Sequence, residues 1–315
     1  MKTNIRFRVK LTLLFWLLLF NSATIFAQSD TIAPKKNLRK WGVAAGHAAT
    51  WTGAFIALDQ AWYANYEKDK FHFYNDNKEW LQMDKWGHIW TANQLSRFST
   101  EAWKWSGMTD KQSIWLGGIS GWAFQSVIEI QDGFSKEWGF SWGDMLANTI
   151  GSAAFVAQRL TWQEERITFK LSYTAQKWND PILSQRSDEL FGTGISEKLL
   201  KDYNAQTYWV SANIHSFFPD SKLPKWLNMA FGYGAKNMLG GYHNEFTLKD
   251  GTSYNYNHLK RERMLYLSPD IDFTRIPTQK KWLKAIFFTM NMIKMPAPAL
   301  SFAQRSGWKW HWIAF

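Results

Sequence analysis

The spacing of apolar residues changes after Thr161, and this change predicts two kinds of secondary structure in succession. Between residues 39 and 161 apolar residues recur at helical spacing, in four segments separated by short polar or glycine-containing stretches. Beyond residue 161 apolar and polar residues alternate, which is the period of a β-strand with two different faces. We therefore expect an α+β protein, with an N-terminal four-helix module followed by a C-terminal antiparallel β-module.

The four predicted helices differ in the signals that mark their ends. The first, residues 39–66, is rich in Ala, Gly and Thr, which let a neighbouring helix approach closely. The second covers residues 83–105 and the third residues 112–131, with Thr109 or Asp110 as the cap of the third. The fourth begins after Ser141, a good N-cap residue, and runs to about residue 159.

The β-module, residues 162–315, has strand patterns interrupted by turns and by one amphipathic helix. Strands are predicted from residues 166, 207, 225, 263, 298 and 307 onward, with a hairpin turn at Asp250-Gly251. Residues 177–195, which include Pro181, are predicted to form a loop and residues 196–204 a short helix. An amphipathic helix is expected between Pro277 and Pro296, and it could lie on a membrane surface or cover one end of the sheet or barrel.

The alternation leaves two architectures open for the β-module. Small or polar residues on one strand face, with the aromatic C-terminal residue Phe315, are typical of a small outer-membrane barrel or partial barrel. A soluble antiparallel sheet packed on the helices explains the same alternation. Asp270 and Asp272 share one strand face, so they would face the lumen of a barrel or the solvent beside a sheet.

The first residues predict export from the cytoplasm. Lys2, Arg6, Arg8 and Lys10 precede an apolar run at residues 11–20 and a small-residue stretch at 23–27, which together indicate a secretory signal peptide over residues 1–27. A retained anchor is the alternative, but the apolar run is shorter than the roughly 20 residues that a spanning helix needs. Residues 28–38 are polar and predict a linker before the helical module at 39–161.

The chain has no cysteine, which limits the chemistry available to it. A disulfide scaffold, a thiolate zinc site and a lipid-modified cysteine are all excluded within this sequence. Any metal site must therefore use oxygen and imidazole ligands. No G-x-S-x-G sequence occurs either, so a serine nucleophile of that kind has no support.

Charge and aromatic content bear on the partners. The net charge of +11 becomes +7 when residues 1–27, with four basic residues and no acidic one, are removed. Because the basic residues form no long block, a nucleic-acid partner is not expected, and outer-membrane lipids or lipopolysaccharide fit an exported basic protein better. The 21 tryptophans favour a membrane interface, where indole rings collect, although a Trp-rich soluble core would use them too.

Polar residues cluster on the predicted helices between positions 84 and 151. Asp84 and His88 are four residues apart, as are Asp144 and Asn148, so each pair lies on one helical face. The candidate site residues are Asp84, Lys85, His88, Glu129, Asp132, Asp144 and Asn148. Asp84, His88, Glu129 and Asp144 are the candidate ligands of a divalent metal, and Lys85 or Arg97 could hold a phosphate. The alternative is a buried network that fixes the helices in register.

Several of these motifs resemble a known family. The segments DKWGH (84–88), EIQDGF (129–134) and ANTIG (147–151) are similar to the YfiM-like family of periplasmic proteins of unknown function. The segments SANIHSFFP (211–219), FGYGAKNML (231–239) and MPAPAL (295–300) resemble longer members from Bacteroidetes. The resemblance implies an envelope location and a compact helical module with Asp, His, Glu and Asn in its core. Short members are typically lipoproteins, whose lipid anchor cannot be carried over without a cysteine.

These observations predict an exported protein of the periplasm or outer membrane. The expected role is structural or lipid/ligand binding at the outer membrane, without catalysis, and protein partners are not identified. The alternative is a metal-assisted hydrolase acting on lipid or cell-wall precursors, in which a bound ion activates water. Convergence of Asp84, His88, Glu129 and Asp144 to metal distance would favour the hydrolase. Pairing of these groups with one another would favour the structural role.

Overall fold

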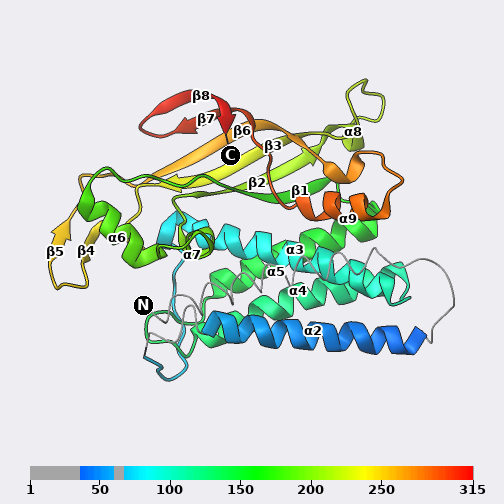
Figure 1. Cartoon of the computed structure of the whole chain (residues 1–315), viewed down its shortest axis with the longest axis horizontal. Helices are drawn as coiled ribbons and strands as arrows, with labels where there is room; N and C mark the ends of the chain where they lie inside the picture. Colours follow the sequence, from blue (N-terminus) through cyan, green and yellow to red (C-terminus); the bar gives the residue numbers. More distant parts are fainter. Residues whose placement is uncertain (1–35, 60–66, 315) are drawn as a thin grey trace. The chain divides into compact units, whose positions relative to one another are not determined.

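A computed structural model describes residues 36–59 and 67–314 (Figure 1). The predicted signal peptide, most of the predicted linker and Phe315 lie outside these residues. The chain divides into two compact units, each assembled from several stretches. The helical unit contains the described residues up to Asp76, His88–Glu165 and Pro277–Thr289, and the sheet unit contains Asn77–Gly87, Arg166–Ile276 and the residues from Met290 onward.

The helical unit contains the four helices that the apolar spacing predicts. They are α2 (Lys36–Leu58), α3 (Met83–Trp105, from His88 onward in this unit), α4 (Asp110–Asp132) and α5 (Trp142–Thr161). The bounds of α3 match the prediction, and Thr109 caps α4 in a capping box with Gln112. Ser141 caps α5 as expected, by accepting a hydrogen bond from the Asp144 backbone amide. The prediction extended the first helix to residue 66, and residues 60–66 lie outside the described part of the chain.

Glycines let α3, α4 and α5 pack closely (Figure 1). A Cβ atom at Gly121 of α4 would lie 2.5 Å from the carbonyl oxygen of Ala92, and one at Gly151 of α5 would lie 2.3 Å from that of Ile89. Both carbonyls belong to α3, so these two helices contact the α3 backbone directly. These glycines of α4 and α5 therefore have a packing role. The close approach predicted for the first helix is not found at its glycines, because Cβ atoms at Gly42, Gly46 and Gly53 of α2 would meet no heavy atom within 4 Å among the described residues.

The sheet unit contains an antiparallel sheet, which confirms the α+β class. Its six described strands follow the order β1-β2-β3-β6-β7-β8, and β4 pairs with β5 in a separate hairpin. The turn of that hairpin includes Gly251, whose φ of 89° suits glycine. The strands are β1 (Ile167–Tyr173), β2 (Gln206–Asn213), β3 (Leu227–Lys236), β4 (Glu245–Thr247), β5 (Ser253–Asn255), β6 (Glu262–Ile271), β7 (Ala297–Ala303) and β8 (Gly307–Ala314).

Two local predictions for this unit are wrong. Residues 177–195 are not a loop, because α6 (Pro181–Phe191) forms there, capped by Asp180 and ended by Gly192. Proline fits the first helical position, where its missing N–H costs nothing, so Pro181 begins the helix and does not prevent it. The strand predicted from residue 207 to 218 ends at Asn213, whose side chain caps the short helix α8 (Ile214–Phe217).

The remaining helices are short. The helix predicted at 196–204 is observed as α7 (Ile195–Lys201), and single 3₁₀ turns occur as η2 (Glu79–Gln82) and η3 (Phe273–Arg275). The predicted amphipathic helix is α9 (Lys281–Met290), which belongs mostly to the helical unit. The Phe288 ring on α9 packs edge-to-face on Phe98 of α3.

A buried ion pair lies on the polar face of the sheet. Lys170 Nζ of β1 is 2.7 Å from Asp270 Oδ2 of β6, and both side chains are fully buried. Lys170 also donates a hydrogen bond to the carbonyl oxygen of Ile271, and Ser211 Oγ donates one to Asp270 Oδ2. Asp270 was expected to face solvent beside a sheet, and that expectation is wrong.

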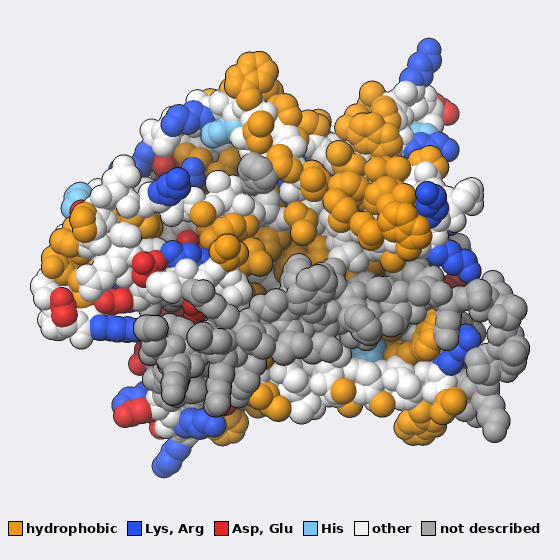
Figure 2. All heavy atoms as spheres, viewed as in Figure 1, with side chains coloured by type: hydrophobic (Ala, Val, Ile, Leu, Met, Phe, Trp, Pro, Cys, Tyr) orange, Lys and Arg blue, Asp and Glu red, His pale blue; other side chains and the backbone are white. Residues whose placement is uncertain are grey.

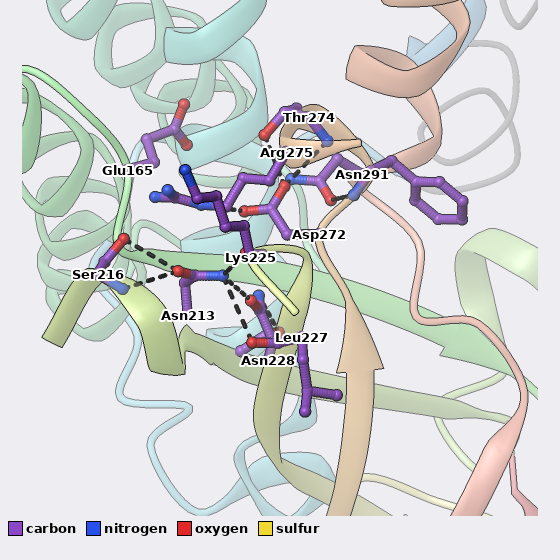
Figure 3. A network of polar contacts seen from close by, with 12 residues as sticks. Glu165, Asn213, Ser216, Lys225, Leu227, Asn228, Asp272, Thr274, Arg275 and Asn291 are labelled. Carbon is purple, nitrogen blue, oxygen red and sulfur yellow. Dashed lines mark hydrogen bonds and ion pairs between the residues drawn. The ribbon is translucent and has the colours of Figure 1, made fainter. Parts of the chain in front are cut away.

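Further buried polar groups continue from this pair along β2 and β3. Asn228 Nδ2 donates to Ser211 Oγ, and Asn213 Nδ2 donates to Asn228 Oδ1 at 2.7 Å. Figure 3 shows Asn213 at the centre of this part, between Ser216 and Asn228. Asp272, also expected in solvent, is buried, caps η3 and pairs with Arg275. The polar face of the sheet is thus hydrogen-bonded in the interior of the protein.

The lowered pKa of the buried Lys294 leads us to predict that the protein becomes more stable as pH rises. Burial lowers the pKa of its ammonium group from 10.5 to about 8, while Asp270 acts in the opposite direction. Between those two pH values the unfolded chain binds the proton and the folded protein has released it, so the free energy of unfolding should increase from pH 8 to pH 10.5. Urea denaturation at pH 8 and pH 10 measures this increase. Lys294→Met should abolish the part due to Lys294, whereas Lys249→Met, at an exposed lysine, should leave it unchanged.

Candidate functional sites

A polar centre lies among α3, α4 and α5 of the helical unit. His88 of α3 places Nε2 3.5 Å from Glu129 Oε1 of α4 and 3.6 Å from Asp144 Oδ1 of α5. The glycine contacts of α4 and α5 with α3 bring the three helices close enough for this meeting. The centre therefore joins one imidazole and two carboxylates from three helices.

The second ring nitrogen of His88 is held by α5. Nδ1 is 2.9 Å from Asn148 Oδ1, and Gln125 Nε2 lies 3.3 Å from the same nitrogen. An amide oxygen only accepts hydrogen bonds, so the shorter contact assigns the proton to Nδ1. In the neutral ring, Nε2 then presents its lone pair to the side where Glu129 and Asp144 lie.

Glu129 is the more buried of the two carboxylates, with 1% of its surface exposed. The pKa of this carboxyl group is raised from 4.5 to about 8, mainly by burial; the charge of His88 acts to lower the pKa, and the negative charges of Asp144 and Asp132 act to raise it. Oε2 lies 3.4 Å from the Ser141 backbone amide. Within the described residues, Oε1 accepts no hydrogen bond, although it is the oxygen that faces His88.

The structure shows the following contacts for other predicted site residues. Asp84 and Lys85, on the first turn of α3 within the sheet unit, form an ion pair of 3.0 Å. Asp132 follows Glu129 by almost one helical turn and acts on it through its charge. Arg97, considered for phosphate binding, is buried and its Nε is 2.9 Å from Glu165 Oε2.

Two contributors were missed by the sequence analysis. Gln125 precedes Glu129 by one turn of α4, a spacing that could have identified it. Asp76 accepts a hydrogen bond of 2.6 Å from Ser141 Oγ, and no local spacing links these residues. His47 does not join the centre: its ring nitrogens contact Val43 O and Ser99 Oγ, and its ring stacks on Trp103.

The sheet unit presents a second candidate, the row of six apolar residues that we call the apolar row. Directly paired residues in neighbouring antiparallel strands share one face of the sheet. From β1 to β8 the register gives one unbroken row, and none of its members is buried. The members are Phe169, Val210, Phe231, Leu267, Leu300 and Trp310.

The opposite face of the sheet holds buried polar residues together with apolar ones such as Trp209. Thr168, Lys170 and Ser172 of β1 are buried, whereas the apolar residues that alternate with them are not. On β8 the side chains of Trp308, Trp310 and Trp312 are 67%, 55% and 78% exposed. In β1 and β8 the apolar residues are thus the less buried ones, the inverse of an ordinary sheet, whereas β2 also buries Trp209, which pairs with Lys170.

Exposed apolar residues also occur on α9. Trp282 and Ile286 are exposed, and Figure 2 shows hydrophobic side chains gathered at the surface over this helix. Across residues 36–59 and 67–314, no helix has both the length and the apolar character needed to cross a bilayer.

One family model matches the chain. Residues 70–159 match the family described as "Predicted periplasmic lipoprotein (DUF2279)", a span that contains every member of the polar centre. The match supports a relation to an uncharacterised periplasmic family and fits an exported envelope protein of uncertain role. No curated protein and no solved structure matches the chain.

Proposed function

We propose that this protein associates with membrane lipid through the exposed apolar face of its sheet. The observation that carries the proposal is the apolar row, which crosses all six strands without a buried member. Removing apolar surface from water contributes about 25 cal/mol per Å², so such a face is stabilised when an apolar medium covers it. Lipid acyl chains are that medium.

Lipid is favoured over a protein partner by the residues at the edge of the sheet. Trp308, Trp310 and Trp312 expose indole rings, which combine an apolar body with an N–H donor and suit the membrane–water interface. The net positive charge of the chain favours anionic headgroups or lipopolysaccharide phosphates.

We assign this association to the outer membrane, facing the periplasm. The predicted signal peptide and the periplasmic description of the matching family support export. The resemblance to longer YfiM-like members from Bacteroidetes fits the same location. The role is then that of a non-catalytic, lipid-binding envelope protein.

Vesicle flotation tests the proposal. The full chain should float with vesicles of phosphatidylethanolamine and phosphatidylglycerol, and the triple variant Trp308→Ser, Trp310→Ser, Trp312→Ser should lose most of that binding, since it removes three exposed rings from one edge strand. The double variant Ile195→Ser, Leu223→Ser removes exposed apolar residues elsewhere in the sheet unit and should still float. Equal flotation of the wild type and the triple variant would overturn the proposal. So would a wild-type protein that stays unbound and self-associates through this face.

The alternative function is a metal-assisted hydrolase acting on lipid or cell-wall precursors. It is supported by the convergence of His88, Glu129 and Asp144, because a metal held by three protein ligands can keep a position for water. This alternative requires that the protein hydrolyse such a precursor, that a chelator stop the reaction, and that Glu129→Gln abolish it. Lipid binding without turnover favours the non-catalytic role.

A further inference from the structure

We propose that His88 Nε2, Glu129 Oε1 and Asp144 Oδ1 bind one divalent first-row metal ion, of the Zn²⁺ or Mn²⁺ class. The proposal goes beyond lipid association and concerns only the helical unit. The three side chains each offer one ligand atom, and these atoms all lie within 4.8 Å of one another. Imidazole nitrogen with carboxylate oxygen is a ligand set that these ions accept.

The distances favour a shared ion over direct hydrogen bonds. His88 Nε2 is 3.5 Å from Glu129 Oε1 and 3.6 Å from Asp144 Oδ1, whereas a charged N–H···O bond is about 2.7–2.9 Å long. Ligand atoms about 2.1 Å from a tetrahedral Zn²⁺ lie about 3.4 Å from each other. The observed separations are therefore close to those of atoms that share a metal.

Burial provides the second observation. Glu129 is 1% exposed, and among the described residues its Oε1 accepts no hydrogen bond while facing His88 and the centre. A buried carboxylate oxygen without a donor is costly, and a cation supplies the missing interaction. The side chain of His88 is 18% exposed, so this ligand is the one that an entering ion can reach.

The surrounding residues position the ligands as metal sites require. Asn148 Oδ1 accepts a hydrogen bond from the Nδ1–H of His88, which fixes the tautomer whose Nε2 can bind a metal. Ser141 caps α5 through the Asp144 backbone amide and also lies beside Glu129 Oε2. Asn148 is thus a positioning residue and not a ligand in this proposal.

Metal binding to the purified full chain tests the inference. After treatment with a chelator, titration with Zn²⁺ or Mn²⁺ alone should give about one bound ion per chain. Loss of a residue that orients a ligand costs about 10–100-fold in metal affinity, so Asn148→Ala should weaken binding by that factor. Glu129→Gln and Asp144→Asn, which remove ligands and keep side-chain size, should each weaken it by more.

The matched control is His47→Gln, in the same unit, whose ring nitrogens contact Val43 O and Ser99 Oγ. This variant should bind as the wild type does, and circular dichroism should show that all variants fold. No Zn²⁺ or Mn²⁺ binding by the folded wild type would overturn the inference, as would equal affinity in the wild type, Glu129→Gln and Asp144→Asn. Vesicle flotation with and without chelator separates this result from the lipid proposal, since flotation depends on the sheet face.

Discussion

Lys170→Met is expected to lower the free energy of unfolding by about 3–5 kcal/mol, because it leaves the Asp270 carboxylate buried without the ammonium group that it contacts directly. The ion pair between Lys170 Nζ and Asp270 Oδ2 is 2.7 Å long, and neither side chain is exposed. Asp270→Leu should lower the free energy of unfolding by a similar amount, because it leaves the Lys170 ammonium group buried without the carboxylate that it contacts. Urea denaturation followed by circular dichroism measures both values.

The double variant Lys170→Met, Asp270→Leu shows whether an unpaired buried charge causes the loss of stability in the single variants. Replacing both members of a buried pair by apolar residues removes the isolated charge, so the double variant should be more stable than either single variant. Lys136→Ala is the control, because Lys136 forms an ion pair of 2.6 Å with Glu67 in which both side chains are largely exposed. Its free energy of unfolding should differ from that of the wild type by less than about 1 kcal/mol. A double variant whose loss equals the sum of the two single losses would contradict this account.

Gly121→Ala is expected to destabilise the helical unit by about 1–3 kcal/mol, since overpacking of a close helix contact forces backbone shifts. The added Cβ would lie 2.4 Å from Ser96 Oγ and 2.5 Å from the carbonyl oxygen of Ala92. The side chain of Ser96 can rotate, but the carbonyl belongs to the α3 backbone and cannot move alone. Thermal or urea denaturation gives the change in stability.

Gly46→Ala, in the same unit, is expected to stabilise the protein and so to have the opposite effect. Gly46 lies inside α2, and a Cβ there would meet no heavy atom within 4 Å among the described residues. Alanine should then stabilise the helix by up to about 1 kcal/mol, because it restricts the unfolded chain and has the higher helix propensity. Equal effects of the two substitutions would show that close packing does not determine the role of Gly121.

Local signals were sufficient for most of the secondary structure. The helix α3 has the predicted bounds, and Ser141 caps α5, because apolar spacing and capping depend on residues close in sequence. The same local reasoning failed at Pro181, where one residue type permits either a loop or the first turn of a helix. The cap at Asp180 decides between them.

Only part of the polar centre could be predicted from the sequence. The spacing of Asp144 and Asn148 placed them on one face of a helix, and Asn148 indeed lies beside His88. Asp84 has the same spacing from His88, yet the ion pair that the structure shows for it is with Lys85. Which of several equally spaced groups meet depends on helix packing, and that packing is set by glycine contacts between distant parts of the chain.

The sequence by itself determined the order of helices and strands, and the alternation that gives each strand of the sheet two faces. Only the tertiary structure decided which face is buried, since alternation has the same period whichever side meets the interior. Here the interior receives Lys170 and Asp270, whose charges are satisfied by each other, and the surface receives the apolar row. Pairing across six strands is a long-range property, and it aligned apolar residues that are far apart along the chain.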